Sequence, residues 1–226
     1  MLFDFHGTLA QVEEPVRWVL QAAAACGREL DRAKATVLAD RLVMAGRAGG
    51  PVPHRVPPHL AEHWADRDLY AHSHRAAYTG LAATVTTDVD GLPDALYERL
   101  LGADGWLPYA DSAPTLRTLH DAGIKVAVVS NIGFDIRPFF AAWGLDTLVD
   151  AFALSYEVGR CKPDPAIFLR ACGMLGADPE RTLMVGDSPA DAGAVGAGCA
   201  ALVLPAAEPG RANGLDATLA LAGCAG

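Results

Sequence analysis

The segment Lys125-Val-Ala-Val-Val-Ser130 is a continuous apolar run that stops at a polar residue, and it gives the clearest indication of the fold class. Runs of this length without polar alternation are typical of parallel strands that are covered on both faces. Met1–Phe5 is shorter but has a similar composition. Three further segments share this character: Ala151–Leu154, Thr182–Val185 and Ala200–Leu204. The sequence therefore predicts a buried parallel sheet built from these segments.

Helical segments with recognisable ends lie between the predicted strands. Asp111 and Ser112 offer an N-cap for a helix that stops at Gly123. The dipeptide Asp164-Pro165 places a capping carboxylate before a proline in the first turn, and it opens a helix that runs to about Leu175. Alternation of strands and helices predicts an α/β core with a Rossmann-like, doubly wound parallel sheet.

The stretch from about residue 13 to residue 102 has a different pattern. Apolar spacing and helix-stop residues predict four helices there, and the segment Gly46–Pro58 is a loop rich in glycine and proline. The predicted helices are Pro15–Cys26, Asp31–Ala45, His59–Tyr78 and Leu92–Leu101. We therefore expect a core made of residues 1–12 and 106–226, and an inserted helical cap domain made of residues 13–105, joined by hinges near residues 10–14 and 102–109.

Charge and composition of the 226-residue chain narrow the expected partners. Lys and Arg number 18 against 27 Asp and Glu, and the resulting net charge of −9 disfavours binding to nucleic acid. Apolar runs such as Val126–Val129 are far shorter than the roughly 20 residues of a membrane helix. The sequence opens without a secretory pattern and carries five widely spaced cysteines, so we expect a cytoplasmic protein with free thiols. A small-molecule partner is expected, and the chain could be a monomer or a homodimer.

Polar residues follow the predicted strands at the edge where ligands bind in an open α/β sheet. They form four clusters: Asp4–Thr8, Ser130-Asn131, Lys162-Pro163 and Gly186–Asp191. Two carboxylates brought together from separate strands repel each other, and a hard divalent cation such as Mg²⁺ relieves this repulsion while accepting phosphate oxygens. A lysine and a hydroxyl nearby would complete a cradle for phosphate.

These four clusters, in this order, resemble the motifs of the haloacid dehalogenase-like (HAD) hydrolase superfamily, in the subfamily with an α-helical cap inserted after the first motif. The resemblance covers essentially the whole chain. The first motif of the family, DxDGT, corresponds to Asp4-Phe-His-Gly-Thr8. The second corresponds to Ser130 with Asn131, and the third to Lys162 in Lys-Pro-Asp-Pro. The fourth, GDSxxxD, corresponds to Gly186-Asp-Ser188 and Asp191.

The resemblance implies a magnesium-dependent phosphatase that acts on a small phosphorylated metabolite. Asp4 would be the nucleophile and would form an aspartyl-phosphate. Mg²⁺ would lie between Asp4, the backbone carbonyl of His6 and Asp187, with Asp191 as a further ligand or a residue that holds water. The residues that would hold the substrate and its non-bridging oxygens are Thr8, Ser130, Asn131 and Lys162.

His6 departs from the family pattern, because most phosphatases of the family carry a second aspartate there. A histidine can protonate a leaving oxygen and later activate water, so His6 is a predicted general acid/base. The alternative is that its imidazole fills space or positions the substrate. Three other functions remain open: a metal-independent 2-haloacid dehalogenase, a sugar phosphomutase, and a phosphate-binding protein that has lost turnover.

Several of these residues also have a purely structural interpretation. Asp187 could cap the following helix, and Asp191 stands where first-turn acids are favoured by the helix dipole. Ser130 and Asn131 are common in turns after strands. His59 and His63 are four residues apart in the insertion, which is a possible ligand spacing, but no third ligand is in register. The role of the insertion's histidines therefore stays open.

Overall fold

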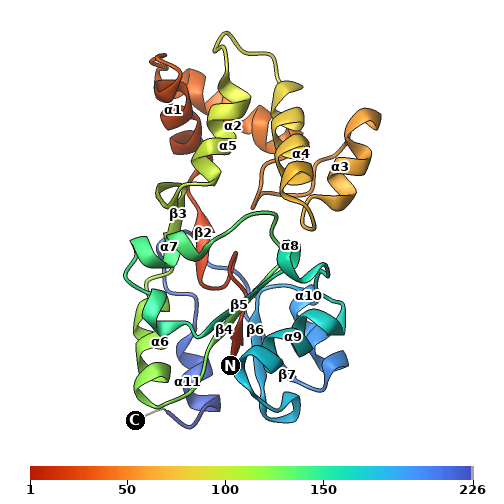
Figure 1. Ribbon diagram of the computed structural model, residues 1–226. Coiled ribbons are helices and arrows are strands. Elements are labelled where there is room, and N and C mark those ends of the chain that lie inside the picture. The colour runs from red at the N-terminus through yellow and green to blue at the C-terminus, as the bar shows by residue number, and fades with distance from the viewer. Residues whose placement is uncertain (225–226) are drawn as a thin grey trace. The chain divides into compact units, whose positions relative to one another are not determined.

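The computed structural model describes residues 1–224 and divides the chain into two compact units (Figure 1). One unit is formed by residues 1–11 together with the chain from residue 107 onward, and the other by residues 12–106. None of the helices in the described part of the chain has the length and apolar character that crossing a bilayer requires.

The first unit is built on five parallel strands in the order β5-β4-β1-β6-β7. β1 lies at the centre, where Leu2 is in register with Ala127 of β4 on one side and with Met184 of β6 on the other. The strands are β1 (Leu2–Phe3), β4 (Ala127–Ser130), β5 (Ala151–Leu154), β6 (Leu183–Gly186) and β7 (Ala200–Val203). The predicted parallel α/β sheet is therefore confirmed.

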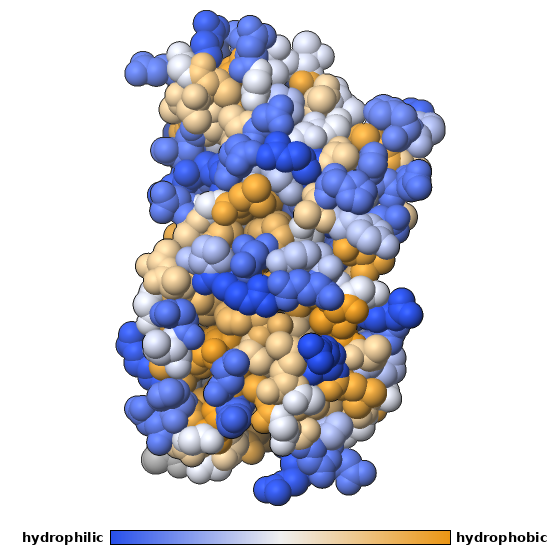
Figure 2. Space-filling model, in the orientation of Figure 1, coloured by the Kyte–Doolittle hydropathy of each residue, from blue (hydrophilic) through white to orange (hydrophobic). Residues whose placement is uncertain are grey.

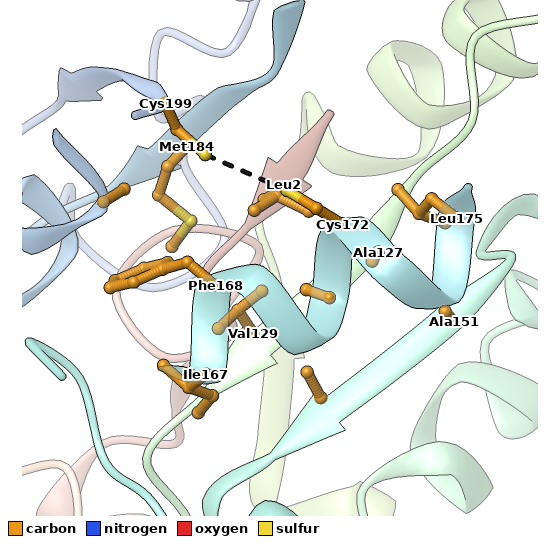
Figure 3. Packing of buried hydrophobic residues seen from close by; sticks show 13 residues of the cluster. Leu2, Ala127, Val129, Ala151, Ile167, Phe168, Cys172, Leu175, Met184 and Cys199 are labelled. Atoms are coloured by element: carbon orange, nitrogen blue, oxygen red, sulfur yellow. Dashed lines mark hydrogen bonds between the residues drawn. The ribbon is translucent and has the colours of Figure 1, made fainter. Parts of the chain in front are cut away.

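Helices cover both faces of this sheet, as a doubly wound fold requires. α9 (Pro165–Leu175) packs on β4 and β5, and its Phe168 and Cys172 join a buried cluster with Leu2 and Met184 (Figure 3). In that cluster the Sγ atoms of Cys172 and Cys199 are 3.9 Å apart. Phe152 alternates with β5 residues of this cluster, so it points to the opposite face, where its ring is 5.1 Å from that of Phe140 in α7 (Arg137–Ala142).

The remaining helices of this unit are α6 (Ser112–Asp121), α8 (Ser155–Val158), α10 (Pro189–Ala192) and α11 (Asp216–Leu221), with 3₁₀ turns η3 (Asp146–Leu148), η4 (Pro179–Arg181) and η5 (Gly193–Ala197). Two sequence-based expectations need correction here. β7 is an edge strand rather than a buried one, and its Val203 is 44% exposed. Asp111 precedes α6 but its side chain makes no capping hydrogen bond.

The second unit is helical, as predicted for the insertion. Its helices are α1 (Pro15–Ala25), α2 (Arg32–Ala45), α3 (Ala61–Asp66), α4 (Ala71–Ala83) and α5 (Leu92–Leu100), with 3₁₀ turns η1 (Pro58–Leu60) and η2 (Ala103–Gly105). α2 begins where its sequence indicates, because the side chain of Asp31 accepts a hydrogen bond from the amide of Lys34 at 2.8 Å. Trp18, Leu42 and Leu96 belong to a buried cluster that joins α1, α2 and α5.

The single helix expected over His59–Tyr78 is wrong. The chain forms η1 and α3, turns at residues 67–70 and continues as α4. Trp64 and Tyr78 explain the turn: 14 residues of continuous helix would separate them by about 21 Å, whereas their ring centroids are 5.8 Å apart. The apolar positions of this stretch therefore serve two helices that pack on each other.

Two short strands lie where the chain passes from one unit to the other. β2 (Ala10–Val12) and β3 (Trp106–Pro108) form a separate two-stranded sheet within the segments predicted to be hinges. On the face drawn in Figure 2, hydrophilic and hydrophobic residues both reach the surface in each unit. This is ordinary for folded domains, since apolar atoms supply more than half of a typical protein surface.

Candidate active site

The carboxyl edge of the parallel sheet brings together residues that are far apart in the sequence. Asp4 directly follows β1, and its amide donates to the carbonyl of Val185 in the neighbouring strand β6 at 2.8 Å. Asp187 follows β6, and Ser130 is the last residue of β4 on the other side of β1. Because parallel strands end at the same edge, the central strand presents Asp4 between these neighbours.

Lys162 is a buried cation between two buried carboxylates. Its Nζ donates to Oδ1 of Asp4 and to Oδ1 of Asp191, both at 2.6 Å. The exposed fractions of Asp4, Lys162 and Asp191 are 7%, 6% and 1%. Buried charges are expensive unless they are paired. One lysine therefore holds two carboxylates in place, and the negative charge at this point exceeds the positive charge.

Burial and neighbouring charges together shift the pKa values of these groups. Burial raises the pKa of Asp4 to about 6, and the charges of Asp191 and Asp187 act in the same direction, while Lys162 opposes them. Burial and the charge of Asp191 also raise the pKa of Asp187. Burial acts to lower the pKa of Lys162, but Asp4 and Asp191 outweigh it and raise that pKa above its ordinary value. The carboxylates thus crowd one another in a poorly solvated place.

The crowded carboxylates are suited to binding a divalent cation. Oxygen atoms of Asp4, Asp187 and Asp191 all lie within 4.8 Å of one another. Carboxylate oxygens are the ligands that hard cations such as Mg²⁺ and Ca²⁺ prefer. A divalent cation would also remove the excess negative charge that Lys162 leaves uncompensated, so the residues present are suited to the group.

Asp191 is the most constrained of the three carboxylates. Its Oδ2 accepts hydrogen bonds from the amide of Ser188 at 3.0 Å and from Oγ of Ser188 at 2.6 Å, while Oδ1 accepts from Lys162. The bond from the amide of Ser188 is one half of a capping box at the start of α10. A Cβ on Gly186 would lie 2.1 Å from Cγ of Asp191, so only glycine permits this approach. The carboxylate is therefore fixed from three sides.

Gly7 is required where Asp187 approaches the turn after β1. Its φ angle is +83°, and a Cβ placed on it would lie 2.2 Å from Oδ2 of Asp187. The left-handed backbone and the close approach both exclude a side chain at this position. The glycine of the first motif thus allows a carboxylate of the fourth to reach the site.

The polar residues after Asp4 complete this turn. His6 is half-buried and forms a backbone bridge with Ala10. Thr8 is fully buried, and its Oγ1 has no hydrogen-bond partner among residues 1–224. A buried hydroxyl without a partner costs free energy, so this atom is suited to a ligand oxygen. Ser130 is also buried, at 2% exposure.

The side-chain amide of Asn131 contacts the backbone of Lys162 through both its oxygen and its nitrogen. Its Oδ1 accepts from the amide of Lys162 at 2.7 Å, and its Nδ2 donates to the carbonyl of Lys162 at 2.9 Å. In the described structure the side chain therefore holds the backbone of the catalytic-lysine candidate. Its expected contact with a substrate remains a prediction.

Asn213 belongs to this site but no sequence motif pointed to it. Its Nδ2 donates to the carbonyls of Gly7 at 3.0 Å and Thr8 at 3.1 Å. The carboxylate of Asp111 in turn accepts from the amides of Asn213 and Leu215, each at 2.9 Å. The C-terminal segment therefore supports the turn that carries Thr8. A pattern in the sequence could not reveal a contact across about two hundred residues.

A five-stranded parallel sheet with carboxylates and a lysine at its carboxyl edge, interrupted after its first strand by a helical insertion, defines a class of α/β hydrolases. The chain belongs to the haloacid dehalogenase-like hydrolase family, whose model matches residues 1–197. The predicted resemblance and the predicted fold with its helical insertion are thereby confirmed.

Relatives with two different activities are similar to this chain. A phosphoglycolate phosphatase of Haemophilus influenzae (strain 86-028NP) is 37% identical over 98 residues, which cover 42% of this chain and 44% of that protein. The (S)-2-haloacid dehalogenase 4A of Burkholderia cepacia is 36% identical over 104 residues, 45% of each chain. The chain thus matches less than half the length of these relatives. This chain is also similar to the crystal structure of a dehalogenase, with a TM-score of 0.65 and 25% sequence identity. The match covers 97% of this chain and 95% of the dehalogenase chain.

Proposed function

We propose that this hydrolase is a Mg²⁺-dependent phosphatase that acts on a small phosphorylated metabolite through an aspartyl-phosphate. The observation that carries the proposal is the group of three carboxylates around one lysine, Asp4, Asp187 and Asp191 with Lys162. Such an arrangement has an excess of negative charge until a divalent cation is bound, and with the cation it attracts a phosphate group. The similarity to a phosphoglycolate phosphatase supports the same activity.

In the proposed reaction, a carboxylate oxygen of Asp4 attacks phosphorus and the bond from phosphorus to the substrate's oxygen breaks, so the alcohol leaves. Water then attacks the aspartyl-phosphate and releases inorganic phosphate. Lys162 lies 2.6 Å from Oδ1 of Asp4, so it can contact both the nucleophile and a phosphate oxygen next to it. Thr8 and Ser130 would donate their hydroxyl groups to the other non-bridging oxygens.

Mg²⁺ would be held by Asp4, Asp187 and the backbone carbonyl of His6, with Asp191 close by, and when bound it would neutralise charge on the phosphate oxygens. We assign His6 to proton transfer: its imidazolium would protonate the departing oxygen, and the neutral ring would then accept a proton from water. The alternative role for His6 is to position the substrate without transferring a proton.

A metal-independent 2-haloacid dehalogenase is the second candidate function. It is supported by the similarity to a haloacid dehalogenase in sequence and to a dehalogenase in structure, and by the absence of a second acid at position 6. In that reaction Asp4 would attack carbon, halide would leave, and water would hydrolyse the resulting ester. Asp187 argues for the phosphatase, because a carboxylate crowded by two others is unfavourable without a cation.

One set of assays on the full chain distinguishes the two functions. A panel of phosphorylated metabolites is incubated with Mg²⁺ or with EDTA, and 2-chloropropionate is incubated under the same two conditions. We expect phosphate release that EDTA stops, and its loss in Asp4→Asn. Asp146→Asn, an exposed aspartate of the same unit, is the matched control and should retain the parent's rate.

Other outcomes have defined meanings. Chloride release that persists in EDTA, without phosphate release, would replace the phosphatase by the dehalogenase. A strict requirement for a sugar bisphosphate activator would indicate a phosphomutase. Tight binding of beryllofluoride without turnover of any ester would indicate a phosphate-binding protein.

A further inference from the structure

The backbone that carries Lys162 lies outside the helices and strands of its unit. Residues 159–164 connect α8 to α9, so the amide and the carbonyl of Lys162 take no part in a helix or a strand. The residue is only 6% exposed, and buried backbone groups need hydrogen-bond partners. The main chain at Lys162 therefore depends on partners from elsewhere in the fold.

The side chain of Asn131 supplies a partner to each of these two groups. Its Oδ1 accepts from the amide of Lys162 at 2.7 Å, and its Nδ2 donates to the carbonyl of Lys162 at 2.9 Å. A primary amide has a donor and an acceptor at a fixed spacing, so one asparagine can bind the N–H and the C=O of one residue. The two bonds together fix the position and the orientation of the backbone at Lys162.

Asn131 is in turn held in place through the residue that follows it. Oγ of Ser155 accepts from the amide of Ile132 at 2.8 Å and donates to the carbonyl of Ile132 at 3.2 Å. Ser155 is fully buried at the start of α8, directly after β5, and the last residues of β4 and β5 are in register. The chain that leaves β4 is thus bound to the chain that leaves β5, one residue beyond Asn131.

The position of the backbone determines where the ammonium of Lys162 lies. A lysine side chain is a flexible four-carbon stem, but this one is 4% exposed, so packing leaves it few conformations. A displacement of the main chain is therefore transmitted to Nζ. This atom donates to Oδ1 of Asp4 and to Oδ1 of Asp191 at the same time, both at 2.6 Å. A shift of about 1 Å would lengthen at least one of these contacts beyond hydrogen-bond distance.

We propose that Asn131 is the positioning residue of Lys162, and that Ser155 keeps Asn131 in place. The expected effect on the rate rests on the proposed function, in which Lys162 contacts both the nucleophile Asp4 and the phosphate. The effect on the position of the ammonium does not rest on it, because that position is set in the protein without substrate.

The competing interpretation is that Asn131 acts on the substrate alone. Beyond its two bonds to Lys162, the amide retains one N–H and one lone pair, which could contact a substrate. The two interpretations differ in the free protein, since only a positioning residue affects the ammonium when no substrate is bound. They also differ in kinetics: a contact that binds substrate and transition state equally changes KM and leaves kcat unaltered.

The test follows the ammonium of Lys162 by NMR in the full chain, with ¹⁵N-labelled lysine and with Mg²⁺ in the buffer. The sequence has three lysines, and the other two, Lys34 and Lys125, are exposed. Burial and hydrogen bonds slow the exchange of ammonium protons with water, so we expect one protected signal, which Lys162→Met should remove. Asn131→Ala should accelerate this exchange at least about tenfold without substrate. It should also lower kcat on the order of 10²-fold for an ester that the parent hydrolyses.

Asp164→Ala is the matched control in the same segment. The side chain of Asp164 accepts from the amide of Ala166 at 2.9 Å and caps α9, so its removal costs stability without touching the bonds between Asn131 and Lys162. We expect this variant to keep the slow ammonium exchange and the kcat of the parent.

An exchange rate in Asn131→Ala equal to that of the parent would overturn the proposal, even with a raised KM, because it would assign Asn131 to the substrate alone. Equal acceleration in Asp164→Ala, or a parent without a protected signal, would also overturn it. If Asn131→Ala does not fold, Ser155→Ala should accelerate exchange instead, and an unaltered rate there would refute the inferred support.

Failure of the proposed function is a separate result. A parent that releases phosphate from no ester would lose the assignment as a phosphatase. Faster ammonium exchange in Asn131→Ala would still support the positioning role in that case.

Discussion

Replacing Gly7 by alanine should remove activity while leaving the fold in place. Two separate effects follow from the structure. The φ angle of +83° costs an alanine about 1–2 kcal/mol. The new methyl group would lie 2.2 Å from Oδ2 of Asp187, where ordinary contact begins at 3.4 Å, so the carboxylate must retreat by about 1 Å.

The displacement of Asp187 determines the size of the catalytic effect. A misplacement of about 1 Å in a catalytic arrangement costs on the order of 10²-fold in rate. We therefore expect kcat/KM of Gly7→Ala to fall at least about 10²-fold, and its free energy of unfolding to fall by about 1–2 kcal/mol. The rate is measured with whichever substrate the parent turns over, and the free energy of unfolding by urea titration.

Gly123→Ala is the matched control, because it carries the same backbone strain without the contact. Its φ angle is +71°, and a Cβ there would meet nothing within 4 Å. It should lose a similar free energy of unfolding and keep the parent's kcat/KM. If Gly7→Ala retained the parent's kcat/KM, or if the two variants lost activity equally, the inferred role of Gly7 in admitting Asp187 would be refuted.

Three further predictions concern other parts of the chain. His6→Ala should slow turnover by about 10²-fold if the imidazole transfers a proton, and an unchanged kcat would remove that role. Asn213→Ala removes the hydrogen-bond donor of two backbone carbonyls near Asp4, so the free energy of unfolding in urea titration should fall by about 1–3 kcal/mol. The same change should lower kcat more than it changes KM. An unaltered kcat would show that Asn213 contributes to stability alone. Burial lowers the pKa of His74 to about 3, so between pH 6.5 and 3 the unfolded chain binds a proton that the folded chain does not, and stability should fall on acidification by up to about 1.4 kcal/mol per pH unit. His74→Phe should flatten this dependence in urea titrations at several pH values, and an unchanged slope would contradict the assignment.

The central elements of the sheet could be predicted because local sequence is sufficient for them. β4 is a continuous apolar run, and it is buried throughout. α9 begins at Pro165, where the side chain of Asp164 accepts from the amide of Ala166 as its sequence indicates. The meeting of Asp4 and Asp187 at one edge also follows from the sequence, since both come directly after strands of a parallel sheet.

Features that depend on distant contacts could not be predicted. β2 and β3 have three residues each, which is too short for an alternating pattern to be recognised. The break between α3 and α4 arises because Trp64 packs against Tyr78, a tertiary contact that helical periodicity does not encode. Asp111 is of a residue type that is common at helix N-caps, but its carboxylate accepts a hydrogen bond from the amide of Asn213 instead.

The bonds from Asn213 to the carbonyls of Gly7 and Thr8 have a consequence for biosynthesis. A ribosome translates Asn213 206 residues after Gly7. During that interval the nascent chain carries the proposed nucleophile Asp4 without the side chain that supports the adjacent turn. Catalytic competence should therefore appear only after Asn213 has been translated, even if the sheet begins to assemble earlier.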